Sequence, residues 1–216
     1  MERKKRLFAA AALAAGLAAP TARAVQISEV LYDATGSDNG KVFVELWGAA
    51  GTSLEGWKLE GVNGGDGAVG PTLTLSGVIP GDGFFVVGDT DGTASQVANV
   101  DLTLNFDLQN GPDSVVLRDA LGNALDSLGY GAFGPTDVFA GEGGAAPGAA
   151  AGQSVARVFA NRDTNDNAAD FGLLDVPTPG TGPLAAPEPG AAAALAVALC
   201  ALGALRRDSA SPSAVH

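Results

Sequence analysis

Short apolar runs, separated by clusters of glycine, aspartate and asparagine, recur through the middle of the chain. None of these runs continues at helical spacing for long enough to indicate a helix, whereas their length and their valine, isoleucine and aromatic content favour strands. Many short strands divided by turns are typical of a sandwich or a barrel. We therefore expect an all-β fold, with strands at residues 25–32, 41–48, 54–60, 72–79, 84–88, 101–107, 114–119, 124–130 and 154–159.

Three of these segments carry further information about the core. Both alternating faces of residues 41–48 bear large apolar side chains, which predicts a strand in the middle of a sheet. Trp57 has a large apolar area and is expected to anchor the core. The residues Leu121-Gly122-Asn123 interrupt the apolar pattern, so residues 114–130 should form a hairpin.

The N-terminus has the three parts of a secretory signal peptide. Residues 3–6 are basic, residues 7–19 are apolar, and Ala22 and Ala24 are small residues at the positions that a signal peptidase reads. We expect signal peptidase to cleave before Val25. The alternative, a short buried helix, does not account for the order of these parts.

The charge of the segment between Val25 and Pro187 excludes one class of partner. This segment holds 21 acidic and five basic residues, a net charge of −16. Such a surface repels phosphate backbones, so we expect no nucleic-acid partner, whereas divalent cations would be attracted to it. The one cysteine, Cys200, lies outside the segment, so no disulfide can form within it.

Few residues of this segment could carry out catalysis. The sole histidine is His216, the last residue, so neither a Ser-His-Asp arrangement nor a histidine-based zinc site is expected. Glu29 and Glu45 lie inside otherwise apolar strands, where a buried pair could serve as general acid and base. The alternative is that each accepts hydrogen bonds from the backbone or from Trp and Tyr side chains, or faces solvent at a sheet edge.

An acidic stretch near residue 165 spaces oxygen ligands as the start of a calcium loop does. Its candidate ligands are Asp163, Asn165, Asn167 and Asp170. Ala168 and Leu174 stand where an EF-hand needs Gly and Glu, so the stretch is not an EF-hand. It could still hold Ca²⁺, the one cofactor considered, with help from Asp33, Asp38 or Asp91. The alternative is a solvated acidic loop.

Several short motifs follow one another in a fixed order between residues 25 and 180. They are residues 27–33, 42–46, 54–59, the Pro80-Gly81 turn before 84–87, 113–117, 126–130, 152–157, 170–171 and 178–180. In order and rough spacing this series resembles the lamin tail domain, an immunoglobulin-like β-sandwich. One departure is Gly48-Ala49-Ala50, where the family usually carries an asparagine. The resemblance implies a module for attachment or recognition rather than catalysis, and it names no ligand.

A second apolar segment, residues 190–205, follows Pro187-Glu188-Pro189 and ends at Arg206-Arg207. Its 16 residues fall short of the roughly 20 that a membrane-spanning helix needs. The layout resembles the PEP-CTERM sorting signal of Gram-negative bacteria. That resemblance implies an exosortase that holds the tail in the inner membrane, cleaves near Pro187, Glu188 and Pro189, and releases the protein outward. The alternatives are a permanent anchor, with Arg206 and Arg207 on the cytoplasmic side, and a buried core helix.

These observations divide the chain into five segments. We expect a signal peptide (1–24), a lamin-tail-like β-sandwich (25–176), a Pro/Gly-rich linker with the PEP motif (177–189), a hydrophobic sorting segment with the arginine pair (190–207) and a short tail (208–216). The expected function is that of an exported, non-catalytic module that is secreted or held at the surface of a Gram-negative cell.

The role of such a module would be structural, adhesive or ligand-binding, with exopolysaccharide or an envelope protein as its partner. Two alternatives stay open. One is a carboxylate-dependent enzyme that acts on extracellular glycans, and the other is a periplasmic binding domain kept permanently on the inner membrane.

Overall fold

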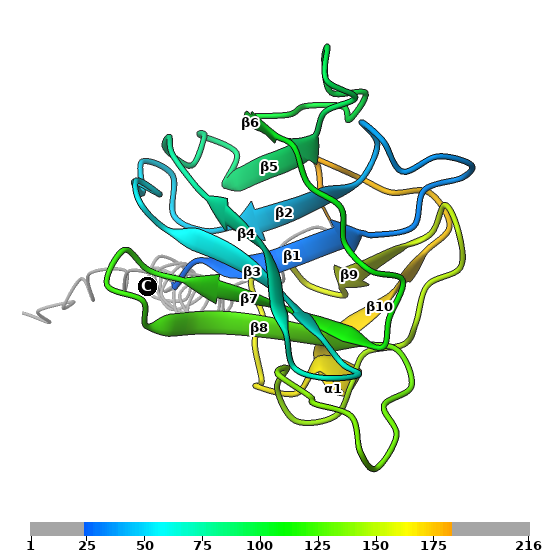
Figure 1. Cartoon of the computed structure of the whole chain (residues 1–216). Coiled ribbons are helices and arrows are strands. Elements are labelled where there is room, and N and C mark those ends of the chain that lie inside the picture. Colours follow the sequence, from blue (N-terminus) through cyan, green and yellow to red (C-terminus); the bar gives the residue numbers. More distant parts are fainter. Residues whose placement is uncertain (1–23, 183–216) are drawn as a thin grey trace, which may run out of the picture.

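Two β-sheets form a sandwich in the computed structural model, which describes residues 24–182 (Figure 1). One sheet has six strands in the order β10-β9-β1-β2-β5-β6, and the other has four in the order β4-β3-β7-β8. All pairs are antiparallel except β5 with β6. The strands are β1 (Gln26–Leu31), β2 (Phe43–Trp47), β3 (Lys58–Asn63), β4 (Val69–Thr74), β5 (Phe84–Asp89), β6 (Leu102–Leu104), β7 (Asp113–Arg118), β8 (Ala124–Tyr130), β9 (Ser154–Arg157) and β10 (Phe171–Leu174), with one helical turn, α1 (Asn167–Asp170), before β10.

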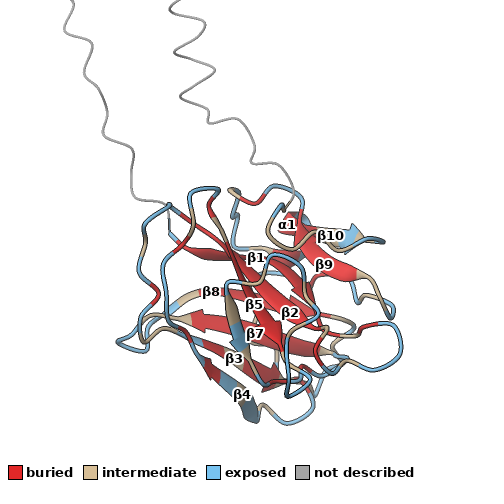
Figure 2. Cartoon of the chain, turned by 90° about the horizontal axis from the view of Figure 1, so that it is seen from above, coloured by how far each residue is buried: buried red, intermediate tan, exposed pale blue. Residues whose placement is uncertain are grey.

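Alternating apolar side chains hold the two sheets together. Val44 and Leu46 come from the six-stranded sheet and Leu59 and Leu117 from the four-stranded sheet, and none of them is more than 1% exposed. Each such side chain contributes about 1.5–3 kcal/mol when it leaves water. Figure 2 shows that buried residues lie on the strands of both sheets. The expected all-β sandwich is therefore confirmed.

The central strands of the six-stranded sheet are buried on their outer face as well. All five residues of β2 are buried, and β2 lies between β1 and β5, as the two apolar faces of its sequence predict. The outer face is covered in part by residues 95–100, which pack on Gly88, and in part by residues 176–182, which reach β1, β2 and Phe84. We call residues 176–182 the C-terminal strap.

The strand boundaries agree with the sequence in some places and differ in others. β8 lies where it is expected, and it forms a hairpin with β7. β3 begins later and β4 earlier than expected, because Leu54 and Ile79 are buried in an irregular continuation of that hairpin, joined by loop hydrogen bonds. β10 and α1 were not expected. Trp57, expected to anchor the core, is only partly buried, although it packs against the core cluster.

The described residues end within the segment expected to link the sandwich to the tail. Residues 177–182, assigned to that linker from sequence, lie against the sheet. In the stretch from 24 to 182, no helix is both long and apolar enough to cross a bilayer. The expected sorting segment, residues 190–207, lies outside the described residues.

Candidate functional site

Two buried carboxylates face each other across neighbouring strands of the six-stranded sheet. Glu29 on β1 and Glu45 on β2 are direct cross-strand partners, and both have no solvent exposure. The register shifts between Ile27 and Glu29, which makes room for an extra residue, Ser28. The Ser28 hydroxyl donates to Glu45 Oε1 at 2.6 Å. The bulge therefore supplies one of the hydrogen bonds that a buried carboxylate needs.

The C-terminal strap supplies most of the remaining donors. Thr178 donates its backbone N–H to Glu29 Oε1 at 2.9 Å and its hydroxyl to Glu29 Oε2 at 2.7 Å. Gly180 donates its N–H to Glu45 Oε2 at 2.6 Å. Ser154 on β9 completes the set with a hydroxyl that lies 2.6 Å from Glu29 Oε1. Glu29 and Glu45, which are distant from the strap in sequence, thus fasten it to the sheet.

Gly180 is required at its position for two reasons. Its φ is +75°, in the left-handed region that side chains disfavour, and an added Cβ would lie 2.4 Å from the Cβ of Asn99. Asn99 itself donates from Nδ2 to the carbonyl of Pro179 at 2.8 Å. The close approach of the strap to the sheet therefore depends on a residue without a side chain.

Every donor named here to the two glutamates is neutral. The pKa of Glu45 is raised to about 7, mainly by burial; the neighbouring Glu29 also raises it, and the Ser28 and Gly180 hydrogen bonds lower it. The geometry assigns both residues the role of hydrogen-bond acceptors, the alternative that the sequence left open. Backbone donors were part of that alternative and are found in the strap amides, whereas serine and threonine hydroxyls take the place of the expected Trp and Tyr side chains.

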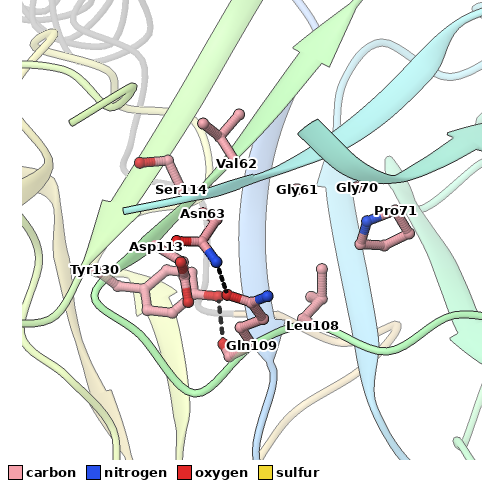
Figure 3. A pocket seen from close by; sticks show the side chains of 10 residues that line it. All are labelled: Gly61, Val62, Asn63, Gly70, Pro71, Leu108, Gln109, Asp113, Ser114 and Tyr130. Atoms are coloured by element: carbon pink, nitrogen blue, oxygen red, sulfur yellow. Dashed lines mark hydrogen bonds between the residues drawn. The ribbon is translucent and has the colours of Figure 1, made fainter. Parts of the chain in front are cut away.

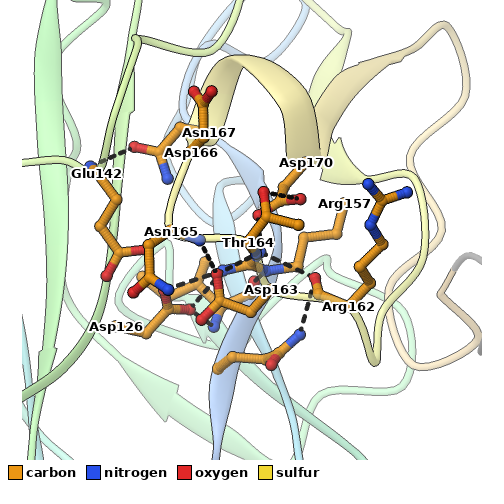
Figure 4. A network of polar contacts seen from close by, with 12 residues as sticks. Asp126, Glu142, Arg157, Arg162, Asp163, Thr164, Asn165, Asp166, Asn167 and Asp170 are labelled. Carbon is orange, nitrogen blue, oxygen red and sulfur yellow. Dashed lines mark hydrogen bonds and ion pairs between the residues drawn. The ribbon is translucent and has the colours of Figure 1, made fainter.

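A second polar cluster surrounds Arg157 of β9, which is fully buried (Figure 4). Its Nη2 lies 2.9 and 3.0 Å from the two carboxylate oxygens of Asp126 on β8, and its Nη1 lies 3.2 Å from Asp170 and 3.4 Å from Asp163. Its Nε donates to the carbonyl of Ile27 at 2.8 Å. The guanidinium also packs over the ring of Phe171, 4.5 Å from the centroid.

The four candidate calcium ligands are not gathered into one ligand set. Asp163 and Asp170 face the Arg157 guanidinium, so a fixed positive charge already lies between them. The Asn167 side chain points elsewhere: its Oδ1 accepts from the N–H groups of Gly129 and Glu142, and its Nδ2 donates to the Ser127 carbonyl. Asn165 adopts a positive φ of 54° in the connecting turn.

A different trio of acids approaches more closely. One carboxylate oxygen each of Asp126, Glu142 and Asp163 lies within 4.8 Å of the others. Glu142 Oε2 is buried and accepts no hydrogen bond within the described part of the chain. Burial, followed by the charges of Asp126 and Asp163, raises the pKa of Glu142 to about 7. Because Arg157 contacts both aspartates, the trio already has a resident cation.

Three hollows in the surface are candidate ligand sites. The one beside Tyr130 and Gln109 holds about 10 Å³, room for a single water (Figure 3). A second, of about 380 Å³, lies next to Asp38, Asp89 and Asp107. Asp89 is engaged there, because it accepts the N–H groups of Gly40 and Phe106 at 2.6 and 2.9 Å. The third, of about 360 Å³, borders the strap and is lined by Pro80, Asp82, Phe84, Asn99, Val100, Asp101, Gly180 and Thr181.

The processing residues expected from sequence fall outside the described residues. They are Ala22, Pro187, Glu188, Pro189, Arg206 and Arg207, whereas Ala24 is the first residue that the structure describes. Sequence reasoning missed the roles of Arg157 and of the strap. A signal for Arg157 was available, because an arginine inside the apolar run Val155-Ala156-Arg157-Val158-Phe159 indicates a buried charge with partners.

One comparison with known proteins bears on this architecture. The profile of the lamin tail domain matches residues 18–132, more than half of the chain. No curated protein matches the sequence. The matched range covers β1 to β8, whereas β9, β10 and the strap follow it in the sequence and complete the six-stranded sheet and its outer face.

Proposed function

Because the chain belongs to the lamin tail domain family, we propose that it is a non-catalytic module that is exported and delivered to the outside of a Gram-negative cell. Its role is structural or adhesive, with exopolysaccharide or an envelope protein as its partner. Signal peptidase removes residues 1–24, and an exosortase acts at Pro187-Glu188-Pro189. The inner membrane holds the tail only until that cleavage.

The observation that carries this proposal is that Glu29 and Glu45 are buried and accept hydrogen bonds from the chain itself. These two carboxylates are the candidates for acid–base catalysis, and neither has any solvent exposure. Their oxygens bind hydroxyl and amide donors of the chain itself, so a substrate would have to displace the strap before it reached them. This arrangement favours attachment over glycan hydrolysis.

The position of the strap also supports attachment. The strap is the last described part of the chain before Pro187, and it is fastened to the two inner strands β1 and β2. A mechanical force on the tail would therefore be transmitted to the middle of a sheet rather than to a loosely held chain terminus. A module that is delivered by its C-terminal segment benefits from such a fastening.

Cell fractionation with intact-mass measurement tests the proposal. In the producing cell, the exported protein should begin at Val25, end between Pro187 and Gly190, and occur outside the inner membrane. A chain that keeps Arg206 and Arg207 and stays in the inner membrane would favour the permanent anchor instead. A Pro187→Ala, Pro189→Ala double variant is the matched control, because it alters the motif and leaves the sandwich unchanged.

The partner can be sought with the mature chain on a glycan array that includes exopolysaccharides of the producing cell. Retention of one polysaccharide class, with no release of shorter sugars after long incubation, is the expected result. Release of reducing ends that is lost in Glu29→Gln or Glu45→Gln would instead establish the enzyme alternative.

A further inference from the structure

In the described part of the chain, the C-terminal strap makes few hydrogen bonds to other residues besides those to the two glutamates. Within the described residues it belongs to no strand, and its internal hydrogen bonds join Thr181 and Gly182 back to the Thr178 carbonyl. Asn99 supplies one further hydrogen bond, and Gly182 packs on the Phe84 ring. Val176, at the start of the strap, is 75% exposed. Docking of the strap therefore depends mainly on its hydrogen bonds to Glu29 and Glu45.

The groups around Glu45 do not stabilise its ionised form. The charged groups that face it are Glu29 on β1 and Asp82 in the turn before β5, and both are acidic. On the next strand, Val86 lies opposite Glu45 and donates its N–H to a further acid, Asp101. None of the ion pairs recorded within residues 24–182 includes Glu29 or Glu45. An ionised Glu45 is thus buried among acids and neutral donors.

A protonated Glu45 can keep every contact that the structure shows. A hydroxyl group accepts as well as donates, so Ser28 can accept a hydrogen bond from the protonated acid in place of donating one. Glu45 Oε2 still accepts the N–H of Gly180. The neutral acid therefore fits the docked geometry without the cost of a buried charge.

We propose that the C-terminal strap is a proton-linked latch, which is docked while Glu45 carries a proton and is released as Glu45 ionises. Release exposes Glu45 to water and removes the cover from the outer face of β1 and β2. The device lies in one cross-strand pair of acids and in the seven residues that cover it.

Linkage gives the direction and size of the effect. Burial is the main cause that raises the pKa of Glu45 from the ordinary 4.5 to about 7, and the docked strap contributes to that burial because Gly180 lies against Glu45. The docked state thus holds its proton to higher pH than the released state. Docking should weaken as the pH rises from about 5 to about 7, by at most about tenfold for each pH unit, and stay constant above about 7.5.

Release of the latch would change how far the tail can reach, a consequence that rests on the proposed function. With the strap docked, Pro187 is five residues beyond Gly182, so a fully extended chain between them spans at most roughly 17 Å. With the strap released, the free chain begins after Asp175 and twelve steps give a reach of roughly 42 Å. The latch would then control how close the sandwich lies to the enzyme that cuts the tail.

Amide hydrogen exchange of the full chain in detergent micelles tests the latch. The amides of Thr178 and Gly180 are the reporters, because each donates directly to one of the two glutamates. Their protection, corrected for intrinsic exchange rates, should fall by 10- to 100-fold between pH 5 and pH 8, while amides of Val44 and Leu46 keep theirs. Constant protection of the two strap amides over this range would overturn the proposal.

Variants identify the responsible group. In Glu45→Gln the strap amides should stay protected at every pH, because glutamine keeps the shape and acceptor of the neutral acid. Glu60→Gln, which changes a surface pair with Arg118, and Glu142→Gln should both keep the wild-type pH dependence. A pH dependence that persists in Glu45→Gln, or that is lost in Glu142→Gln, would contradict the latch.

A further variant covers the case in which Glu45→Gln does not fold. Thr178→Val removes one hydroxyl donor to Glu29, so it should lower strap protection at all pH values without moving the midpoint. A shifted midpoint would contradict the assignment to Glu45. Exchange is measured without any processing enzyme, so the two tests are independent. Constant strap protection would overturn the latch but not the proposed function. A tail that is not cleaved in the cell would contradict the proposed function but not the latch.

Discussion

Arg157 reaches from β9 to Asp126 on β8 and binds both carboxylate oxygens, at 2.9 and 3.0 Å. This pair joins the six-stranded sheet to the four-stranded sheet, and both side chains are at most 1% exposed. Asp126 also accepts the N–H of Ile27 at 2.6 Å, while Arg157 donates to the carbonyl of the same residue. The pair therefore closes the sandwich at the point where β1 begins.

Replacement of Arg157 should strongly destabilise the fold. Arg157→Met leaves Asp126 and Asp170 buried without their cation, and removal of one partner of such a pair costs about 3–5 kcal/mol. Arg118→Met is the matched control, because the Arg118–Glu60 pair is partly exposed and contributes at most about 1 kcal/mol. Chemical denaturation of both variants measures the difference, and equal losses would contradict the assignment.

Glu142 should make the stability of the fold depend on pH. Its pKa in the folded chain is about 7, above the ordinary 4.5, so the folded state holds the proton to higher pH than the unfolded state. Its stabilising contribution is complete below about pH 4.5 and is lost as the pH rises through 7. Glu142→Gln should therefore melt at a higher temperature than the wild type at pH 8 and at the same temperature near pH 4. The exposed Glu55→Gln is the control, and an unchanged melting temperature of Glu142→Gln at pH 8 would argue against this role.

Calcium should leave the melting temperature unchanged. The candidate ligands Asp163 and Asp170 bind Arg157, and Asn167 binds backbone groups, so an ion would have to displace these contacts. Thermal unfolding in millimolar CaCl₂ and in EDTA should coincide. If CaCl₂ instead raises the melting temperature, and Glu142→Gln abolishes that increase, an ion binds at the trio of Asp126, Glu142 and Asp163.

The stacked rings of Tyr32 and Tyr130 provide a fourth test. Their centroids lie 4.2 Å apart with an angle of 9° between the planes, and both side chains are 1% exposed. Tyr130→Ala should cost about 3–5 kcal/mol through loss of packing. Tyr130→Phe keeps the stack and loses only the hydrogen bond to the Gln109 carbonyl, so it should cost about 1 kcal/mol. Similar losses in urea denaturation would show that the ring stack contributes little.

The sequence predicted which residues are buried better than it predicted which residues pair in regular strands. Alternation located β2 and β8 because each of their residues has a fixed face and turn residues bound the strands closely. The same signal failed at β3 and β4, since Leu54 and Ile79 are apolar and buried without belonging to the regular ladder. β10 is short and follows a polar turn, so no periodicity could develop in it.

The candidate site depended on contacts that are distant in sequence. Glu29 and Glu45 were recognisable as acids in apolar strands, yet Thr178 and Gly180 lie 149 and 135 residues away from them. The composition of residues 177–183, rich in proline and glycine, is typical of a linker, which is why all of the strap except Val176 is expected from sequence to form one. The acidic stretch predicted cation ligands, and the cation that Asp163 and Asp170 bind is Arg157 of the chain itself.

The most direct test of the account compares two mature chains that begin at Val25 and end at Gly182 or at Asp175. The shorter chain lacks the strap, so the outer face of β1 and β2 loses its cover and Glu29 and Glu45 lose the donors of Thr178 and Gly180. At pH 5 we expect the longer chain to melt at the temperature of the full protein and the shorter chain to melt lower. Equal melting temperatures would show that residues 176–182 are a linker and would contradict the central claim that they are part of the fold.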